Sequence, residues 1–267
     1  MKDRVSIDFK DGVADVRLIR ADKMNALDPA MFEGILEAGA KLVDMEGLRA
    51  VVLSGEGKAF CAGLDMASFA AMKQDGDAVP GVRDLTKRTH GIANRPQQCA
   101  WLWRQLPVPV IAAVHGVAFG GGFQIALGPD IRYATADTRF SVLEIKWGLV
   151  PDLAGTQLMR HLAREDIVRE LTYTGRIFNG TEAQQYGFVT RVFDDPRTAA
   201  LETAREIASK SPDAIRADKR LLNLAIATDA KTGLMAESIE QQKLIGSPNQ
   251  LEAILSNLQK RAANYKD

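Results

Sequence analysis

The chain has 267 residues, of which 46% are hydrophobic and 25% are charged, which is typical of a folded globular protein with a sizeable core. Lys plus Arg and Asp plus Glu are equal at 34 each, so no long-range positive field favours nucleic acid or an anionic membrane. Two cysteines without metal-ligand spacing indicate neither a disulfide framework nor a metal site. With no secretory pattern at the start, we expect a cytoplasmic protein with no membrane or nucleic-acid partner.

A hairpin and a helix are the first predicted elements. The runs VSIDF (5–9) and VADVRLI (13–19) alternate in polarity and are separated by a turn sequence, KDG. A helix is predicted to follow, with Asp28 as its N-cap and Pro29 at its first position. The apolar run 49–55 then predicts a strand that ends in a glycine-bearing loop.

The middle of the chain predicts an α/β core, because strand patterns alternate there with helix patterns. The segment 66–106 changes composition and is interpreted as an insertion or lid. Thr181 and Gln184 have the spacing of a capping box, which predicts a helix start. The other predicted elements are strands at 109–115, 130–135 and 188–195 and helices around AGTQLMRHL and EDIVRELTYTG.

After Pro196 the pattern is helical throughout. Apolar residues recur on one face of each helix, so these helices need either the protein's own core or another subunit to cover them. We therefore predict a division into a core of residues 1–195 and a helical C-terminal region of residues 196–267, whose role in oligomerisation is implied only by the resemblance given below. The predicted helices span about 196–210, 212–228, 230–245 and 248–263.

Two glycine-rich loops are candidates for binding a developing negative charge. The loop GEGKAFCAGLD (55–65) and the triple glycine 120–122 each permit tight turns that expose backbone N–H groups. Taken alone, the first loop is better explained by a plain strand-to-helix connection, since it matches neither a Walker pattern nor G-x-G-x-x-G. Two loops that aim N–H groups at one point would form an oxyanion hole, in which each donor stabilises a transition state by ~2.7–4 kcal/mol.

A third candidate is the segment 139–157, in which Glu144 and Asp152 lie in apolar surroundings. Burial disfavours the charged form of a carboxylate, so we expect raised pKa values that suit proton transfer near neutral pH. A helix cap or an ion pair is the alternative interpretation of either residue. His115 and Cys61 are interpreted as structural, since neither has a chemical partner nearby in the sequence.

Taken together, RADKMNALD, AFCAGLD, PVIAAVHGVAFGGG, FSVLEIKWGLVPDLAGTQ, GRIFNGTEA and the terminal LQKRAANYKD resemble the crotonase superfamily of enoyl-CoA hydratases and isomerases, over essentially the whole chain. The resemblance implies an α/β fold with a spiral core of ββα units and a C-terminal helical trimerisation region. It implies an acyl-CoA substrate, no metal or redox cofactor, and a trimer or a dimer of trimers.

The resemblance also implies roles for individual residues. Ala62 and Gly121 are expected to supply the two oxyanion N–H donors. Asp65 either contacts the coenzyme or caps the next helix. Arg261 beside Lys260 is expected to approach the 3′-phosphate, often that of a neighbouring subunit. The residues expected to contact coenzyme A or substrate are Lys23, Ala62, Gly63, Leu64, Asp65, Met66, Gly120 and Lys260.

Gln124 distinguishes branches of the superfamily. Hydratases carry glutamates at the positions of Gln124 and Glu144, whereas dienoyl-CoA isomerases carry acidic groups at the positions of Gln124, Glu144 and Asp152. An amide can orient a water molecule but cannot take its proton. We therefore expect double-bond isomerisation, with Glu144 as the principal base, Asp152 as a second acid–base group or as the group that sets the Glu144 pKa, and Gln124 as a neutral positioning residue.

Three alternatives remain at this point. Glu144 could serve as the single carboxylate of an enoyl-CoA hydratase. A thioester hydrolase would need Ser141 or Ser54 as its nucleophile, and neither has a histidine partner that the sequence can place. The chain could also be an inactive acyl-CoA binder, although two carboxylates in a dry pocket disfavour that interpretation.

Overall fold

A computed structural model of the protein describes residues 1, 3–68 and 84–267. Of the 66–106 segment interpreted as an insertion or lid, residues 69–83 lie outside the described residues. The stretch Arg95–Gln105 forms a helix that contributes Cys99 and Trp103 to the main core, so this part is neither an insertion nor a lid. The described residues form two β-sheets and a series of helices, which confirms the predicted α/β class. None of the described helices is both long and apolar enough to cross a membrane.

The larger sheet has six strands in the order β1-β2-β3-β4-β6-β9, and the smaller has three in the order β5-β7-β8. The pairs β1–β2 and β7–β8 are antiparallel, and all other pairs are parallel. The strands are β1 (Val5–Lys10), β2 (Val13–Leu18), β3 (Ala50–Gly55), β4 (Val110–Val114), β5 (Val117–Phe119), β6 (Ile131–Ala134), β7 (Arg139–Ser141), β8 (Phe178–Asn179) and β9 (Arg191–Val192).

Most of the predicted helices are present close to the expected bounds. The Asp28 carboxylate accepts a hydrogen bond from Met31 N, which confirms it as the N-cap. The helices are η1 (Ala21–Lys23), α1 (Pro29–Val43), α3 (Arg95–Gln105), α4 (Gly121–Leu127), η2 (Leu143–Trp147), α5 (Gly155–Met159), α6 (Glu165–Thr174), α7 (Gly180–Tyr186), α8 (Pro196–Ala208), α9 (Pro212–Ala225), α10 (Ala230–Leu244) and α11 (Pro248–Leu258).

The capping box predicted at Thr181 and Gln184 is wrong. The cap is Asn179, whose side chain accepts from Glu182 N while the Glu182 carboxylate accepts from Asn179 N, both at 2.8 Å. An Asn-x-x-Glu pair fits the same motif two residues earlier, and helix α7 therefore begins at Gly180.

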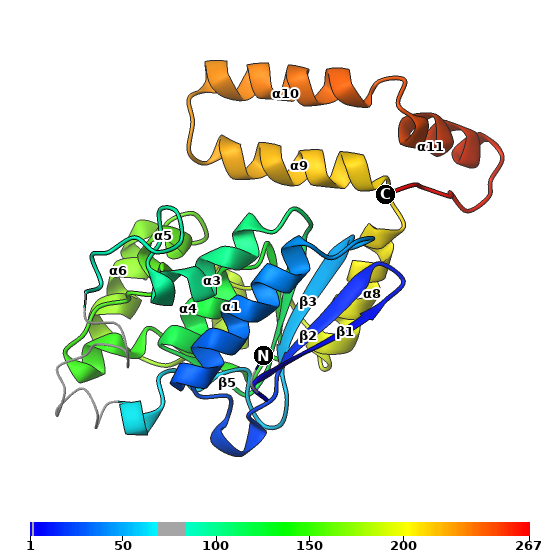
Figure 1. Ribbon diagram of the computed structural model, residues 1–267. Helices are drawn as coiled ribbons and strands as arrows, with labels where there is room; N and C mark the ends of the chain where they lie inside the picture. The colour runs from blue at the N-terminus through cyan, green and yellow to red at the C-terminus, as the bar shows by residue number, and fades with distance from the viewer. Residues whose placement is uncertain (2, 69–83) are drawn as a thin grey trace.

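Both faces of the larger sheet are buried, so successive residues of its central strands enter different cores. Val51 and Leu53 of β3 face a core built with α1, α3 and α4, and Ala50 and Val52 face a second core covered by α8. Figure 1 shows α1, α3 and α4 on one side of the sheet and α8 on the other. This arrangement explains the near-continuous apolar runs of the parallel strands.

Helices α9–α11 project beyond the sheet (Figure 1), with α9 and α10 side by side. One buried cation ties α9 to the core, because Lys219 Nζ donates to Trp103 O, Val108 O and Asp130 Oδ2 at 3.1, 2.7 and 2.8 Å. Helix α8 packs on the sheet, which favours a division of the chain after α8. The boundary predicted from the sequence, between residues 195 and 196, stays a prediction.

Candidate active site

The two glycine-rich loops are in direct backbone contact. Cys61 N donates to Val117 O, and Phe119 N donates to Cys61 O, both at 3.1 Å. Gly63 has φ of +90°, and a Cβ there would lie 2.6 Å from Phe119 O. A Cβ on Gly122 would lie 2.3 Å from Cys61 O. Glycine at these positions is therefore required for the two loops to meet, and this explains why both loops are rich in glycine.

The hydrogen bonds of the first loop correct the predicted donor. Ala62 N–H is already occupied, since it donates to Met24 O at 2.9 Å. Leu64 pairs with Leu27 in a parallel bridge, which turns the Leu64 N–H away from Leu27. Among the described residues, Leu64 N–H has no acceptor, and Gly63 N–H has no backbone acceptor but helps to lower the pKa of the neighbouring Cys61 thiol. The amides of residues 60, 61, 62 and 65 donate to His115 O, Val117 O, Met24 O and Leu27 O.

The second loop supplies the other candidate donor. Gly121 opens α4, and its N–H has no acceptor among the described residues, as expected in the first turn of a helix. The position of a Cβ on Gly63 lies 3.9 Å from Gly121 N, so this amide adjoins the first loop. Gly120 has φ of +51° and donates its own N–H to Ser141 O at 3.0 Å, which fixes the entry into α4.

Glu144 lies in η2 against the triple glycine. A Cβ on Gly120 would lie 3.2 Å from Glu144 Oε1. The side chain is buried, and Glu144 Oε2 has no hydrogen-bond partner. Burial is the main cause of the raised pKa of Glu144, and the nearby charge of Asp152 raises it further. A buried carboxylate with one unoccupied oxygen can accept a proton from a bound molecule.

Gln124 fixes the other oxygen of that carboxylate. Its Nε2 donates to Glu144 Oε1 at 2.6 Å, while its Oε1 accepts from Leu153 N at 2.8 Å and from Gly155 N at 2.9 Å. Ala154 adopts φ of +63° between these two amides, and a Cβ on Gly155 would lie 2.5 Å from Gln124 Oε1. The glutamine is therefore locked in an orientation in which it donates to Glu144.

Asp152 directly precedes Leu153, whose N–H donates to Gln124, the residue that binds Glu144, so Asp152 lies beside this pair. The charge of Asp152 raises the pKa of Glu144, and burial raises the pKa of Asp152 itself. No hydrogen-bond donor to its carboxylate is found in the part of the chain that the structure describes. The structure thus brings together the two residues predicted as acid–base groups, Glu144 and Asp152, and the predicted neutral positioning residue, Gln124.

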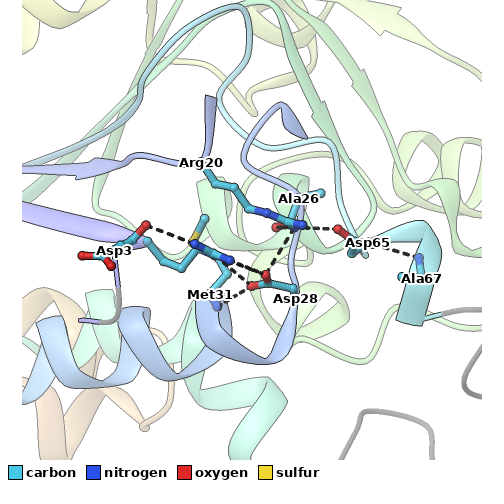
Figure 2. A network of polar contacts seen from close by, with 8 residues as sticks. Asp3, Arg20, Ala26, Asp28, Met31, Asp65 and Ala67 are labelled. Carbon is cyan, nitrogen blue, oxygen red and sulfur yellow. Dashed lines mark hydrogen bonds and ion pairs between the residues drawn. The ribbon is translucent and has the colours of Figure 1, made fainter. Parts of the chain in front are cut away.

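Asp65 is held by structural contacts. Its carboxylate accepts from Ala67 N at 2.8 Å and from Arg20 Nη1 at 2.5 Å (Figure 2). Arg20 also lies 3.5 Å from Asp28, which Arg4 binds through two nitrogens. The capping alternative for Asp65 is confirmed. This network ties the first glycine loop to the start of α1.

The predicted coenzyme contacts divide into two groups. Lys23 is exposed beside Asp65, whose pKa its charge helps to lower, and Met66 is exposed next to them. Lys260 follows α11, which Figure 1 places away from α4 and α5. Within one chain, the structure therefore does not bring Lys260 to the site.

The residues interpreted as structural have structural contacts. Cys61 is fully buried, and burial raises the pKa of its thiol to about 12. A ring nitrogen of His115 lies 2.9 Å from Gly57 O. Ser141 Oγ donates to Gly175 O at 2.8 Å, and Ser54 is buried on β3. No histidine contacts either serine among the described residues, so neither has the partner that a nucleophilic serine needs.

Sequence reasoning missed the role of two parts of the site. The 153–155 turn holds Gln124 through the backbone amides of Leu153 and Gly155. The only feature of the sequence that points to a turn there is the glycine. Arg20 anchors the first loop through Asp65, and the motif RADKMNALD contained it without indicating that contact.

Comparison with known proteins places this geometry in a family. Residues 8–267 match the family model for enoyl-CoA hydratase/isomerase. The rat mitochondrial Δ(3,5)-Δ(2,4)-dienoyl-CoA isomerase is 36% identical over 227 residues, which are 81% of this chain and 67% of that protein. The mouse mitochondrial methylglutaconyl-CoA hydratase is 29% identical over 262 residues, which are 96% of this chain and 80% of that protein. The crystal structure of enoyl-CoA hydratase from Bacillus anthracis matches with a TM-score of 0.87 and 30% identity, over 98% of this chain and 99% of that one.

The family match and these relatives define the class of the protein as an enzyme of the enoyl-CoA hydratase/isomerase type. The chain belongs to the enoyl-CoA hydratase/isomerase, or crotonase, superfamily.

Proposed function

We propose that this enzyme moves a carbon–carbon double bond within an enoyl-CoA or dienoyl-CoA thioester. The observation that carries the proposal is the state of Glu144, whose Oε1 is held by Gln124 while its buried Oε2 has no partner. That arrangement provides one base with one free oxygen next to the triple glycine.

The proposed reaction transfers protons only. Leu64 N–H and Gly121 N–H donate hydrogen bonds to the thioester oxygen. Glu144 Oε2 takes a proton from the α- or γ-carbon, the C–H electron pair moves into a conjugated dienolate, and the negative charge collects on that oxygen. A proton returned to another carbon completes the shift of the double bond. Two oxyanion donors of this kind stabilise the transition state by ~2.7–4 kcal/mol each. No metal or redox cofactor is needed, and coenzyme A is part of the substrate.

Gln124 argues for isomerisation over hydration. Hydration requires a group that takes a proton from water, and an amide cannot do so. Both ends of this amide are also committed, to Glu144 on one side and to two backbone amides on the other. The 36% identity to a protein named as a dienoyl-CoA isomerase agrees with this assignment. Hydration by Glu144 alone remains the second candidate, because a methylglutaconyl-CoA hydratase matches over 96% of the chain.

We assign Asp152 as a second acid–base group or as the residue that keeps the Glu144 pKa high, since its charge acts on Glu144. For coenzyme A, we propose contacts from Lys23, Met66 and the loop that contains Gly63 and Leu64. Lys260 would have to reach the coenzyme of a neighbouring subunit.

We also propose a trimer or a dimer of trimers. Residues of α10 and α11 leave large apolar side chains in solvent, among them Leu234, Ile239 and Leu258, and a neighbouring subunit would cover them.

The test offers the purified protein 2-trans-enoyl-CoA, 3-enoyl-CoA and 3,5-dienoyl-CoA thioesters in heavy water. Absorbance follows conjugation, and mass spectrometry follows deuterium uptake. Movement of the double bond with label at the α- or γ-carbon supports the proposal. Net addition of water would establish the hydratase alternative, and free thiol release would establish a hydrolase. Tight binding without turnover or label would establish an inactive binder.

A further inference from the structure

A separate pocket of about 200 Å³ lies where α3, the end of α5 and the end of α9 meet. Its lining includes two arginines, Arg104 and Arg160, together with His161 and the amide side chains of Gln157 and Asn223. Trp101 forms part of its apolar wall, and no acidic residue lines it. None of these residues belongs to the site built around Glu144.

The walls of this pocket are fixed by buried contacts. Asn223 Nδ2 donates to Arg104 O at 3.0 Å and thereby joins α9 to α3. One helical turn earlier, Lys219 is buried and donates to the carbonyl groups of Trp103 in α3 and of Val108 in the α3–β4 connection. The wall of the pocket formed by α3 and α9 is therefore fixed by the fold, whereas Gln157, Arg160 and His161 on the α5 side are exposed.

No counter-ion for the positive charge of this pocket is found among the described residues. Neither Arg104 nor Arg160 contacts a carboxylate within residues 1, 3–68 and 84–267. By contrast, the nearby Arg164 and Arg169 are ion-paired with Asp166 and Glu165. Arg160 Nε donates to His161 Nε2 at 2.8 Å, so the imidazole ring accepts this hydrogen bond as a neutral group and does not neutralise the charge of Arg160. The positive charges of Arg160 and Arg104 also help to lower the pKa of His161, after burial.

We propose that this pocket binds a small, multiply charged anion that carries phosphate or carboxylate groups. Guanidinium groups bind both kinds of oxyanion through charge-assisted, often bidentate hydrogen bonds, and neutral amides complete the coordination. The volume of about 200 Å³ suits a small metabolite or inorganic ion and not a folded partner. This inference is independent of the proposed isomerase reaction.

The pocket adjoins the catalytic framework through one short helix. Arg160 caps the end of α5, while Gly155 at its start donates to Gln124, which in turn holds Glu144. An anion bound at Arg160 would therefore contact the element that orients the candidate base.

The test is isothermal titration of the full-length protein in a low-salt buffer without phosphate or carboxylate. Inorganic phosphate and citrate are the two probes, and their relative affinities distinguish a phosphate ligand from a carboxylate ligand. The variants are Arg104→Gln/Arg160→Gln and, as a matched control, Arg205→Gln, which removes an exposed cation from the last turn of α8. If the double variant fails to fold, the same titration is carried out with the single variant Arg160→Gln, because Arg160 is exposed.

We expect at least one probe to bind the native protein and the control equally, with the dissociation constant raised tenfold or more in the double variant and raised by added NaCl. Absence of binding to the native protein, or equal binding to the double variant, would overturn the proposal. Sedimentation velocity tests the alternative that a second copy of the chain, and not a small anion, occupies the pocket. If the double variant falls apart into monomers and neither probe binds the native assembly, acidic side chains of a second copy fill the pocket and the proposal is wrong.

Discussion

The glycine-rich loops with helix α4, and the C-terminal helices α10 and α11, differ in which residues they bury: the first region buries apolar side chains and the second leaves them exposed. Around the site, the buried residues of α4 are almost all apolar, and the one polar side chain, that of Gln124, has each of its groups hydrogen-bonded. In α10 no residue is buried, and the only buried residues of α11 are the polar Asn249 and Ser256. The first region buries its apolar side chains and satisfies its polar one within one chain, whereas the second leaves large apolar side chains such as Leu234 and Leu258 exposed.

The strongest test of the site region is Glu144→Gln. The amide keeps the shape of the side chain but cannot take a proton, so we expect kcat to fall by roughly 10²–10⁴-fold with little change in KM. Steady-state kinetics with the best thioester substrate measures this. Glu202→Gln, an exposed residue of α8, is the control and should keep native activity. A Glu144 variant that retains most of its kcat would remove Glu144 from the mechanism.

Two glycine substitutions compare the regions directly. Gly122→Ala places a Cβ 2.3 Å from Cys61 O, so we expect a loss of about 3 kcal/mol or more in the free energy of unfolding. Gly233→Ala in α10 meets only Thr228 Cγ2 at 3.9 Å and should stabilise the helix by about 0.5–1 kcal/mol. Denaturant unfolding measures both. Equal effects of the two substitutions would contradict the contrast between a tightly packed loop layer and an open helix.

Charged residues on the exposed apolar face of the C-terminal helices should disrupt the proposed association of subunits. Leu234 and Leu258 are 63% and 76% exposed, so Leu234→Glu/Leu258→Glu should leave the monomer fold intact. We expect the native protein to form trimers or hexamers and the double variant to shift toward monomer, because burying an unpaired charge in an interface is unfavourable. Light scattering after gel filtration gives the masses, and circular dichroism checks the fold. An unchanged mass would exclude this face from the interface.

The smallest expected effect is a shift in pH dependence. A base must be ionised to act, so activity should fall as the pH drops through the raised pKa of Glu144. The negative charge of Asp152 contributes to that raised pKa, so Asp152→Asn should move the acidic limb of kcat/KM to lower pH. Asp218→Asn on the exposed side of α9 is the control. A limb that stays in place would show that Asp152 does not act on Glu144 through its charge.

Local patterns predicted the hairpin, the Asp28 cap and the helix starts well, because these depend on residues close in the chain. The same reasoning chose the wrong capping box at α7, since two overlapping polar pairs fit one motif. The Ala62 donor was wrong for a different reason. The direction of an amide in the loop is decided by which strand segment pairs with it, and here Met24 and Leu27 occupy the amides on either side of Leu64.

By itself, the sequence determined the α/β class and the two glycine loops, because glycine content and hydrophobic periodicity are properties of short segments. The expectation that Gln124, Glu144 and Asp152 share one site came from the resemblance to the crotonase superfamily. Only the tertiary structure decided that Leu64 keeps the free amide, that Gln124 is locked against Glu144 by the 153–155 turn, and that Arg104 and Arg160 share a pocket. These features join segments that lie far apart in the chain, and hydrogen-bond satisfaction across such contacts depends on the packing of the whole fold.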